Sequence, residues 1–190
     1  MFIRNRLIWL CLGLFSVAVA PAISQSLPLR FTAFAVSTGG PLTPAAAGNI
    51  DITVTRWSTE AETKRLVTAL QEGGHEALLE RLQDVEPVGR IYAPGTLGFD
   101  LRYAHAEDIG DGIRRIVLAT DRPMSFYEVV NRPRTADYPF TFIELRVNED
   151  GEGEGKLALL SAVSATPSGR IQVYNYDSAI QLNEVRRVRY

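Results

Sequence analysis

The feature that most constrains the fold is a series of short apolar runs, separated by turn residues, through the second half of the chain. From residue 88 onward these runs are rich in Val, Ile, Leu, Phe and Tyr, as β-strands are. Connections such as 110–112, 149–155 and 167–169 are only a few residues long. Connections this short join antiparallel neighbours, because a parallel crossover needs a dozen or more residues. The sequence therefore predicts an antiparallel meander.

The predicted strands cover 29–36, 49–57, 89–92, 99–106, 113–120, 140–148, 156–165, 170–175 and 180–188. The stretch 124–131 is ambiguous between helix and strand. Alternation of polar and apolar residues does not say whether such a sheet closes on itself. A barrel and an open sandwich therefore both stay possible at this stage.

Between the second and third predicted strands the apolar spacing changes to that of a helix, at Leu66, Val67 and Leu70. Thr59 and Glu62 have the spacing of a capping box, and the pair of glycines at 73–74 ends the helix. A second short helix is predicted over 76–84. The expected fold class is α+β: a strongly twisted, barrel-like antiparallel sheet of seven to nine strands, with one helical hairpin inserted between the second and third strands.

Residues 1–22 have the pattern of a secretory signal peptide. Two arginines precede an apolar run over 7–20, and the small residues Ala20 and Ala22 flank Pro21. The run is shorter than the roughly 20 residues of a membrane-spanning helix. We expect cleavage after Ala22, export to the periplasm or the medium, and one globular domain over 23–190 with no membrane span. An uncleaved N-terminal anchor is the alternative, because Pro21 lies inside the cleavage motif.

Several function classes find no support in the sequence. Lys and Arg number 20 against 22 Asp and Glu, which gives no reason to expect a nucleic-acid partner. The only cysteine, Cys11, lies in the predicted leader, so the exported domain has neither a disulfide nor a thiolate metal ligand. Neither a zinc motif nor the glycine-flanked serine of a hydrolase elbow occurs. We therefore predict no zinc site and no cofactor.

The chain has two histidines, and only one is a candidate for chemistry. His75 follows two glycines at a helix boundary, where a surface or capping role is expected. His105 is expected to share one face of a strand with Phe99, Leu101 and Tyr103. An enzyme of the hydrolase or isomerase type would pair His105 with a carboxylate such as Asp100 or Glu107.

Arginines and aromatic residues concentrate between Gly98 and Phe140. Such residues anchor anionic or flat ligands and protein partners. The candidate binding residues are Asp100, Arg102, Arg122, Arg134 and Tyr138. The alternative is that the Asp and Arg side chains pair with each other and tie the connections to the sheet.

A weaker candidate for metal binding is the acidic segment 148–154. Asp150, Glu152 and Glu154 alternate with Gly and, together with Asn148, could present oxygen ligands to calcium. The same residues also suit a hairpin tip that is kept soluble by its charge.

Four stretches, 55–60, 98–104, 114–123 and 137–141, read Thr-Arg-Trp-Ser-Thr-Glu, Gly-Phe-Asp-Leu-Arg-Tyr-Ala, Arg-Arg-Ile-Val-Leu-Ala-Thr-Asp-Arg-Pro and Asp-Tyr-Pro-Phe-Thr. In these the chain resembles a family of small exported bacterial proteins of uncharacterised function, over residues 31–187. The resemblance implies a single domain behind a signal peptide and supplies no activity.

The sequence thus favours an exported, non-enzymatic domain that binds a protein or small-molecule partner through the segment between Gly98 and Phe140. The first alternative is a metal-independent enzyme that uses His105. The second is a structural envelope protein acting through an exposed sheet edge.

Overall fold

The computed structural model describes residues 27–38, 45–92, 97–122, 140–158, 163–167, 169–173 and 180–189. The predicted signal peptide, the ambiguous segment 124–131, and the candidate residues Arg134 and Tyr138 lie outside the described residues. The described elements are β1 (Leu29–Thr38), β2 (Ala45–Val54), α1 (Glu60–Gln83), β3 (Gly89–Tyr92), β4 (Phe99–Asp108), β5 (Arg114–Thr120), β6 (Phe142–Val147), β7 (Glu152–Ala158), β8 (Val163–Ala165), β9 (Ile171–Val173) and β10 (Ile180–Val188).

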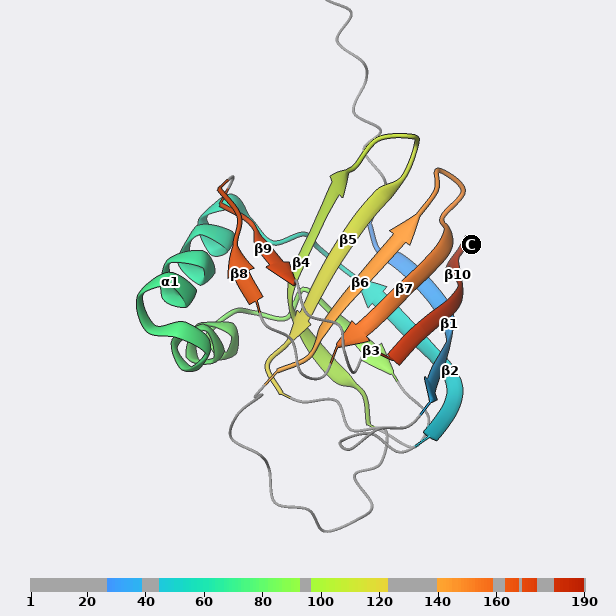
Figure 1. Ribbon diagram of the computed structural model, residues 1–190, viewed down its shortest axis with the longest axis horizontal. Helices are drawn as coiled ribbons and strands as arrows, with labels where there is room; N and C mark the ends of the chain where they lie inside the picture. The colour runs from blue at the N-terminus through green and yellow to red at the C-terminus, as the bar shows by residue number, and fades with distance from the viewer. Residues whose placement is uncertain are drawn as a thin grey trace, which may run out of the picture.

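Eight of these strands close into an antiparallel barrel in the order β1-β10-β7-β6-β5-β4-β3-β2 (Figure 1). Neighbours in the barrel are neighbours along the chain, except where β10 follows β7 and where β10 closes onto β1. The α+β class and the barrel-like antiparallel sheet are confirmed, with a strand number inside the predicted range. Because the sheet closes, the sandwich alternative is wrong.

The expectation of one continuous strand over 156–165 is also wrong. β7 begins at Glu152 and ends at Ala158, while β8 leaves the barrel and pairs with β9 in a separate two-stranded sheet. The turn between β6 and β7 is therefore shorter than the sequence predicts. Gly151 lies in this turn with a φ of 84°, a left-handed conformation that favours glycine. The alternating Gly and Glu of 151–155 lack the β-branched residues typical of strands, which concealed the start of β7.

Apolar side chains fill the interior of the barrel. They come from all eight strands and include Leu29, Phe31, Ile50, Ile52, Ile91, Phe99, Leu101, Ile116, Leu118, Ile143, Leu145, Leu157 and Leu182. An eight-stranded barrel has room either for such side chains or for one small ligand. Here the described apolar side chains pack together inside the barrel, which favours a binding site on its outside.

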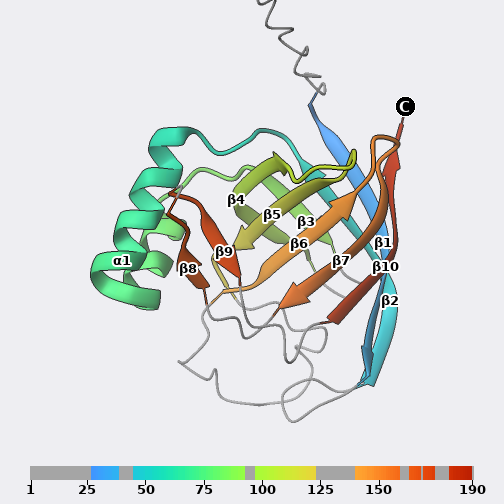
Figure 2. The ribbon, with the colours of Figure 1, turned by 45° about the horizontal axis from the view of Figure 1, so that its top comes forward.

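A second core lies between the barrel and an outer layer, which we define as α1 together with β8 and β9 (Figure 2). The outer layer contributes Leu66, Leu70, Leu78, Leu82, Val163 and Ile171. The outer face of the barrel contributes Tyr103 from β4, Val117 from β5 and Phe142 from β6. Two insertions, one between β2 and β3 and one between β7 and β10, therefore cover the same barrel face.

α1 begins as the sequence predicts. The Thr59 hydroxyl accepts a hydrogen bond from the backbone N–H of Glu62, and the Glu62 carboxylate accepts one from the backbone of Thr59, so the capping box is confirmed. The predicted break at the two glycines is a kink at Gly74, whose φ of 67° and ψ of −150° are not helical. The predicted pair of helices is thus one helical element bent at Gly74, and it lies between β2 and β3 as expected.

A β-bulge in β4 changes which side chains face the barrel interior. Leu101 pairs with Thr120 and Tyr103 with Ala119, so two steps along β4 match one step along β5. Leu101 therefore belongs to the barrel interior, whereas Tyr103 belongs to the core under the outer layer. The expectation that Phe99, Leu101, Tyr103 and His105 share one face is wrong, because the extra residue reverses the alternation.

Within the ranges described above, no helix has the length and apolar character needed to cross a membrane.

Candidate functional site

The described candidates of the arginine-rich segment form an ion-pair network against the barrel. Arg102 donates from Nε to Asp121 Oδ2 at 2.9 Å and from Nη1 to the Val85 carbonyl at 2.7 Å. Asp100 lies between two cations, 3.9 Å from Arg102 and 3.8 Å from Arg90. Arg102 therefore ties the end of α1 to β4 and to the segment that follows β5.

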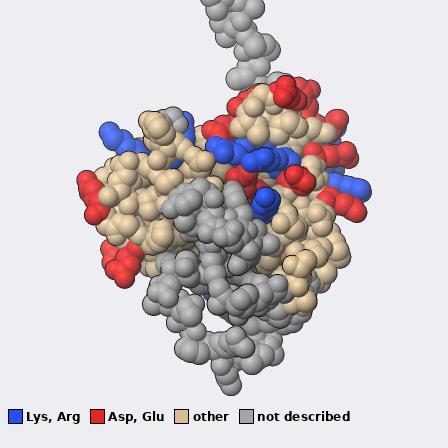
Figure 3. All heavy atoms as spheres, in the orientation of Figure 1, with Lys and Arg blue, Asp and Glu red and all other residues tan. Residues whose placement is uncertain are grey.

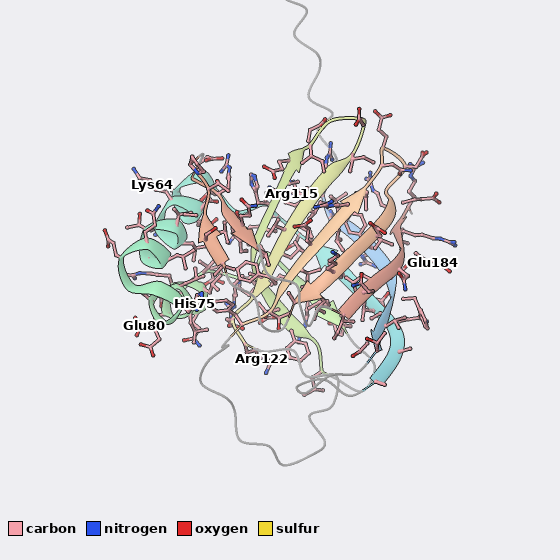
Figure 4. All side chains as sticks on the ribbon, viewed as in Figure 1. Lys64, His75, Glu80, Arg115, Arg122 and Glu184 are labelled. Atoms are coloured by element: carbon pink, nitrogen blue, oxygen red, sulfur yellow. The ribbon has the colours of Figure 1, made fainter. Side chains whose placement is uncertain are left out.

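Arg122 is held at the start of the same strand, β4. Its guanidinium lies 4.7 Å from the centre of the Phe99 ring and donates to the Gly98 carbonyl at 3.0 Å. Asp100, Arg102 and Arg122 thus occupy one end of the barrel. Arg115, near His105, lies toward the other end (Figure 4).

Exposed apolar side chains accompany these arginines. Leu97 is 91% exposed and Tyr92 is 44% exposed, and the Arg90 guanidinium lies 5.4 Å from the centre of the Tyr92 ring. Arg90 also donates to the Leu97 carbonyl at 3.2 Å. We call Arg90, Tyr92, Leu97 and Arg122 the β3–β4 patch. Sequence reasoning included only Arg122 of these four, because a single exposed Tyr or Leu carries no distinctive pattern.

His105 lies on the other half of β4, beyond the bulge. It is half-buried, pairs across the ladder with Val117, and stacks on the Tyr103 ring with centroids 6.4 Å apart. Two ion pairs flank it: Glu107 with Arg115, and Glu60 of α1 with Arg170. Asp100 lies at the other end of β4, on the far side of the bulge.

Burial is the largest cause of the pKa shifts of His105 and Tyr103. It lowers the pKa of His105 below 6.5, and the positive charge of Arg170 lowers it further, while Glu107 and Glu60 act in the opposite direction. Burial raises the pKa of Tyr103 to about 12. The hydroxyls of Tyr103 and Thr63 are both buried, and neither has a hydrogen-bond partner among the described residues.

The geometry that a His105-dependent enzyme needs is not found in the described part of the chain. No hydrogen bond joins His105 to a carboxylate there, and both flanking glutamates are bonded to arginines. Among the described residues, hollows of about 260 and 290 Å³ lie on the surface, and His105 lines neither of these two. General acid–base catalysis requires hydrogen-bonding reach at a concave site.

The larger hollow lies beside the kink of α1, between Leu70, His75 and Val163. The smaller one is lined by Asp150, Glu152, Arg186, Arg187 and Arg189. Three guanidiniums there face two carboxylates, so the hollow favours no single ligand charge. Figure 3 likewise shows basic and acidic side chains interspersed over the barrel.

The acidic segment proposed for calcium, 148–154, covers the β6–β7 turn and the first residues of β7. Asp150 Oδ1 is 3.4 Å from Arg189, and Glu154 stands opposite Arg146 in the ladder. Across the described ranges, no group of three or more His, Cys, Asp or Glu side chains is arranged to hold a metal ion. Arginines beside Asp150 and Glu154 suit a charged turn better than a cation site.

Comparison with protein-family models, with curated proteins and with solved structures gives no significant match. The resemblance to exported bacterial proteins therefore stays an expectation from the sequence.

Proposed function

We propose that the protein is an exported, non-enzymatic domain that binds a protein partner through the β3–β4 patch. The observation that carries this proposal is the exposure of Leu97 and Tyr92 beside two arginines. Tyr and Arg are enriched among the residues that contribute most to protein interfaces. Leu97 directly precedes the arginine-rich segment, which begins at Gly98, and Arg122 belongs to that segment.

Two further features support binding on the outer surface. The described apolar side chains pack together inside the barrel, which favours a binding site on its outside. The patch residues do not line either hollow, so a protein surface fits them better than a small molecule does. Arg102 and Asp121 are bonded to each other and hold the strand end that presents the patch.

The closed barrel also weighs against the alternative of a structural envelope protein that acts through an exposed sheet edge. That alternative needs an exposed sheet edge, and an unpaired strand at residues 186–189 would instead protect such an edge with its charge. In the described structure β10 pairs with β7 on one side and with β1 on the other. A closed barrel leaves no edge there for another chain to extend.

Site-specific photo-crosslinking in the native host tests the proposal. A photoreactive residue at Leu97 is expected to capture a discrete protein, and Tyr92→Ser is expected to weaken that capture. Ile109 is the matched control, because it is 47% exposed but lies just beyond the other end of β4. Equal capture from Leu97 and Ile109, or none from Leu97, refutes the patch. Substrate turnover that His105→Gln abolishes refutes the non-enzymatic assignment.

A further inference from the structure

His105 lies in the seam between the barrel and the outer layer. Its ring stacks on Tyr103, whose side chain is fully buried in the core beneath α1. Just before α1, Ser58 is bonded to the neighbouring residue of β4: its N–H donates to the Ala104 carbonyl, and its Oγ accepts from the Ala104 N–H. A change of charge at His105 therefore acts where the outer layer joins the barrel.

The charged groups around His105 come from every element packed there. α1 contributes Glu60, the residue before β9 is Arg170, β4 contributes Glu107, and β5 contributes Arg115. Glu60 is 2.9 Å from Arg170, and Glu107 is paired with Arg115. These four charges sum to zero, and each carboxylate already has a cation.

The two carboxylates near His105 are each already paired with an arginine, so they offset only part of the cost of a proton on the ring. That proton adds one positive charge to a half-buried seam that already holds two guanidiniums. One of those guanidiniums, Arg170, belongs to the β8–β9 hairpin and joins it to the start of α1. In this seam a protonated His105 is repelled by Arg170 and attracted by Glu60, and the larger cost is that of burying the charged ring between β4 and the outer layer.

We propose that His105 is a proton-sensitive latch: in mildly acidic solution its protonation weakens the attachment of α1, β8 and β9 to the barrel. The direction of the pH dependence follows from which state, closed or open, binds a proton at His105 more readily. Burial and Arg170 hold the pKa of His105 below 6.5 in the closed structure, and exposure restores the ordinary value. The attachment is therefore complete above pH 6.5 and weakens as the pH falls below it.

Hydrogen exchange of the purified protein, compared at about pH 7.5 and about pH 5.5 with correction for intrinsic rates, tests the latch. We expect amide protection in α1 and in the β8–β9 hairpin to fall several-fold at the lower pH. Protection in β1 and β2, on the far side of the barrel, should change much less. Equal loss in all these elements, or no loss in any, overturns the proposal.

Two matched variants assign the effect, because the chain has only two histidines. His105→Gln should remove the pH dependence of protection. His75→Gln should retain it, since His75 lies in the same layer but contacts the Phe140 ring. If His75→Gln removes the pH dependence and His105→Gln retains it, the proposal is overturned. Proton NMR titration of the two imidazoles in the wild-type protein needs no variant, and a His105 pKa above 6.5 would also overturn it.

Discussion

Replacing Glu62 by Gln should destabilise the protein by about 2 kcal/mol at neutral pH. Glu62 accepts two hydrogen bonds from Arg56, at 2.9 and 3.0 Å, and one from the Thr59 backbone at 2.7 Å. Arg56 also donates to the Glu86 carbonyl at 2.8 Å, which lies beyond the other end of α1. The Glu62–Arg56 pair therefore fastens both ends of the helical insertion to the same point of the barrel.

The size of the expected destabilisation follows from the lowered pKa of the Glu62 carboxyl group. The bonds from Arg56 lower the pKa of Glu62 from 4.5 to about 2, outweighing the opposing effect of burial. That difference corresponds to at most about 3 kcal/mol. Solvent around Arg56, whose side chain is 33% exposed, screens part of it, which leaves about 2 kcal/mol. Gln keeps the size of the side chain and an oxygen for the cap, so the substitution removes chiefly the charge.

Urea unfolding followed by circular dichroism measures the effect, with Glu80→Gln as the matched control. Glu80 is on the same helix, and its side chain points into solvent (Figure 4), so its replacement should cost less than about 0.5 kcal/mol. Because the pKa of Glu62 is lowered, its contribution is complete above pH 4.5 and disappears as the pH falls toward 2. Equal effects of the two variants, or a difference that does not shrink in acid, would refute this reasoning.

Three further expectations can be checked by the melting temperature or the urea midpoint. Gly153→Ala should destabilise the barrel by about 2 kcal/mol or more, since the added Cβ would lie 1.9 Å from the Arg146 carbonyl oxygen. Arg102→Met should cost about 2 kcal/mol, because it leaves Asp121 without its 2.9 Å partner; an unchanged midpoint would instead favour a ligand-binding role for Arg102. Excess calcium should leave the melting temperature unchanged, and a rise that Asp150→Asn abolishes would restore the calcium hypothesis.

The features that the sequence predicts correctly are encoded by neighbouring residues. The capping box requires only Thr59 and Glu62, which are three positions apart and bond as expected. The kink at Gly74 likewise follows from the local freedom of glycine. Antiparallel pairing of β4 with β5 and of β6 with β7 follows from the limited reach of their short connections.

The features that the sequence does not predict depend on contacts between distant segments. Closure of the barrel pairs Phe31 with Arg187, and no local pattern at either position specifies that contact. The bulge between Leu101 and Tyr103 is set by how β4 meets β5, and it leaves no mark in the alternation of residues. A single inserted residue reverses the face of everything after it, which is why the expected surroundings of His105 were wrong.

The same bulge divides the candidate residues into two groups that can be tested separately. Leu97 and the arginines beside it lie at the start of β4, whereas His105 lies beyond the bulge, under the outer layer. Only the first group presents exposed apolar surface, and only the second contains a histidine, whose pKa burial lowers below 6.5. His105→Gln should therefore leave crosslinking at Leu97 intact, and Tyr92→Ser should leave the pH dependence of exchange intact. Loss of one property without the other identifies which proposal has failed.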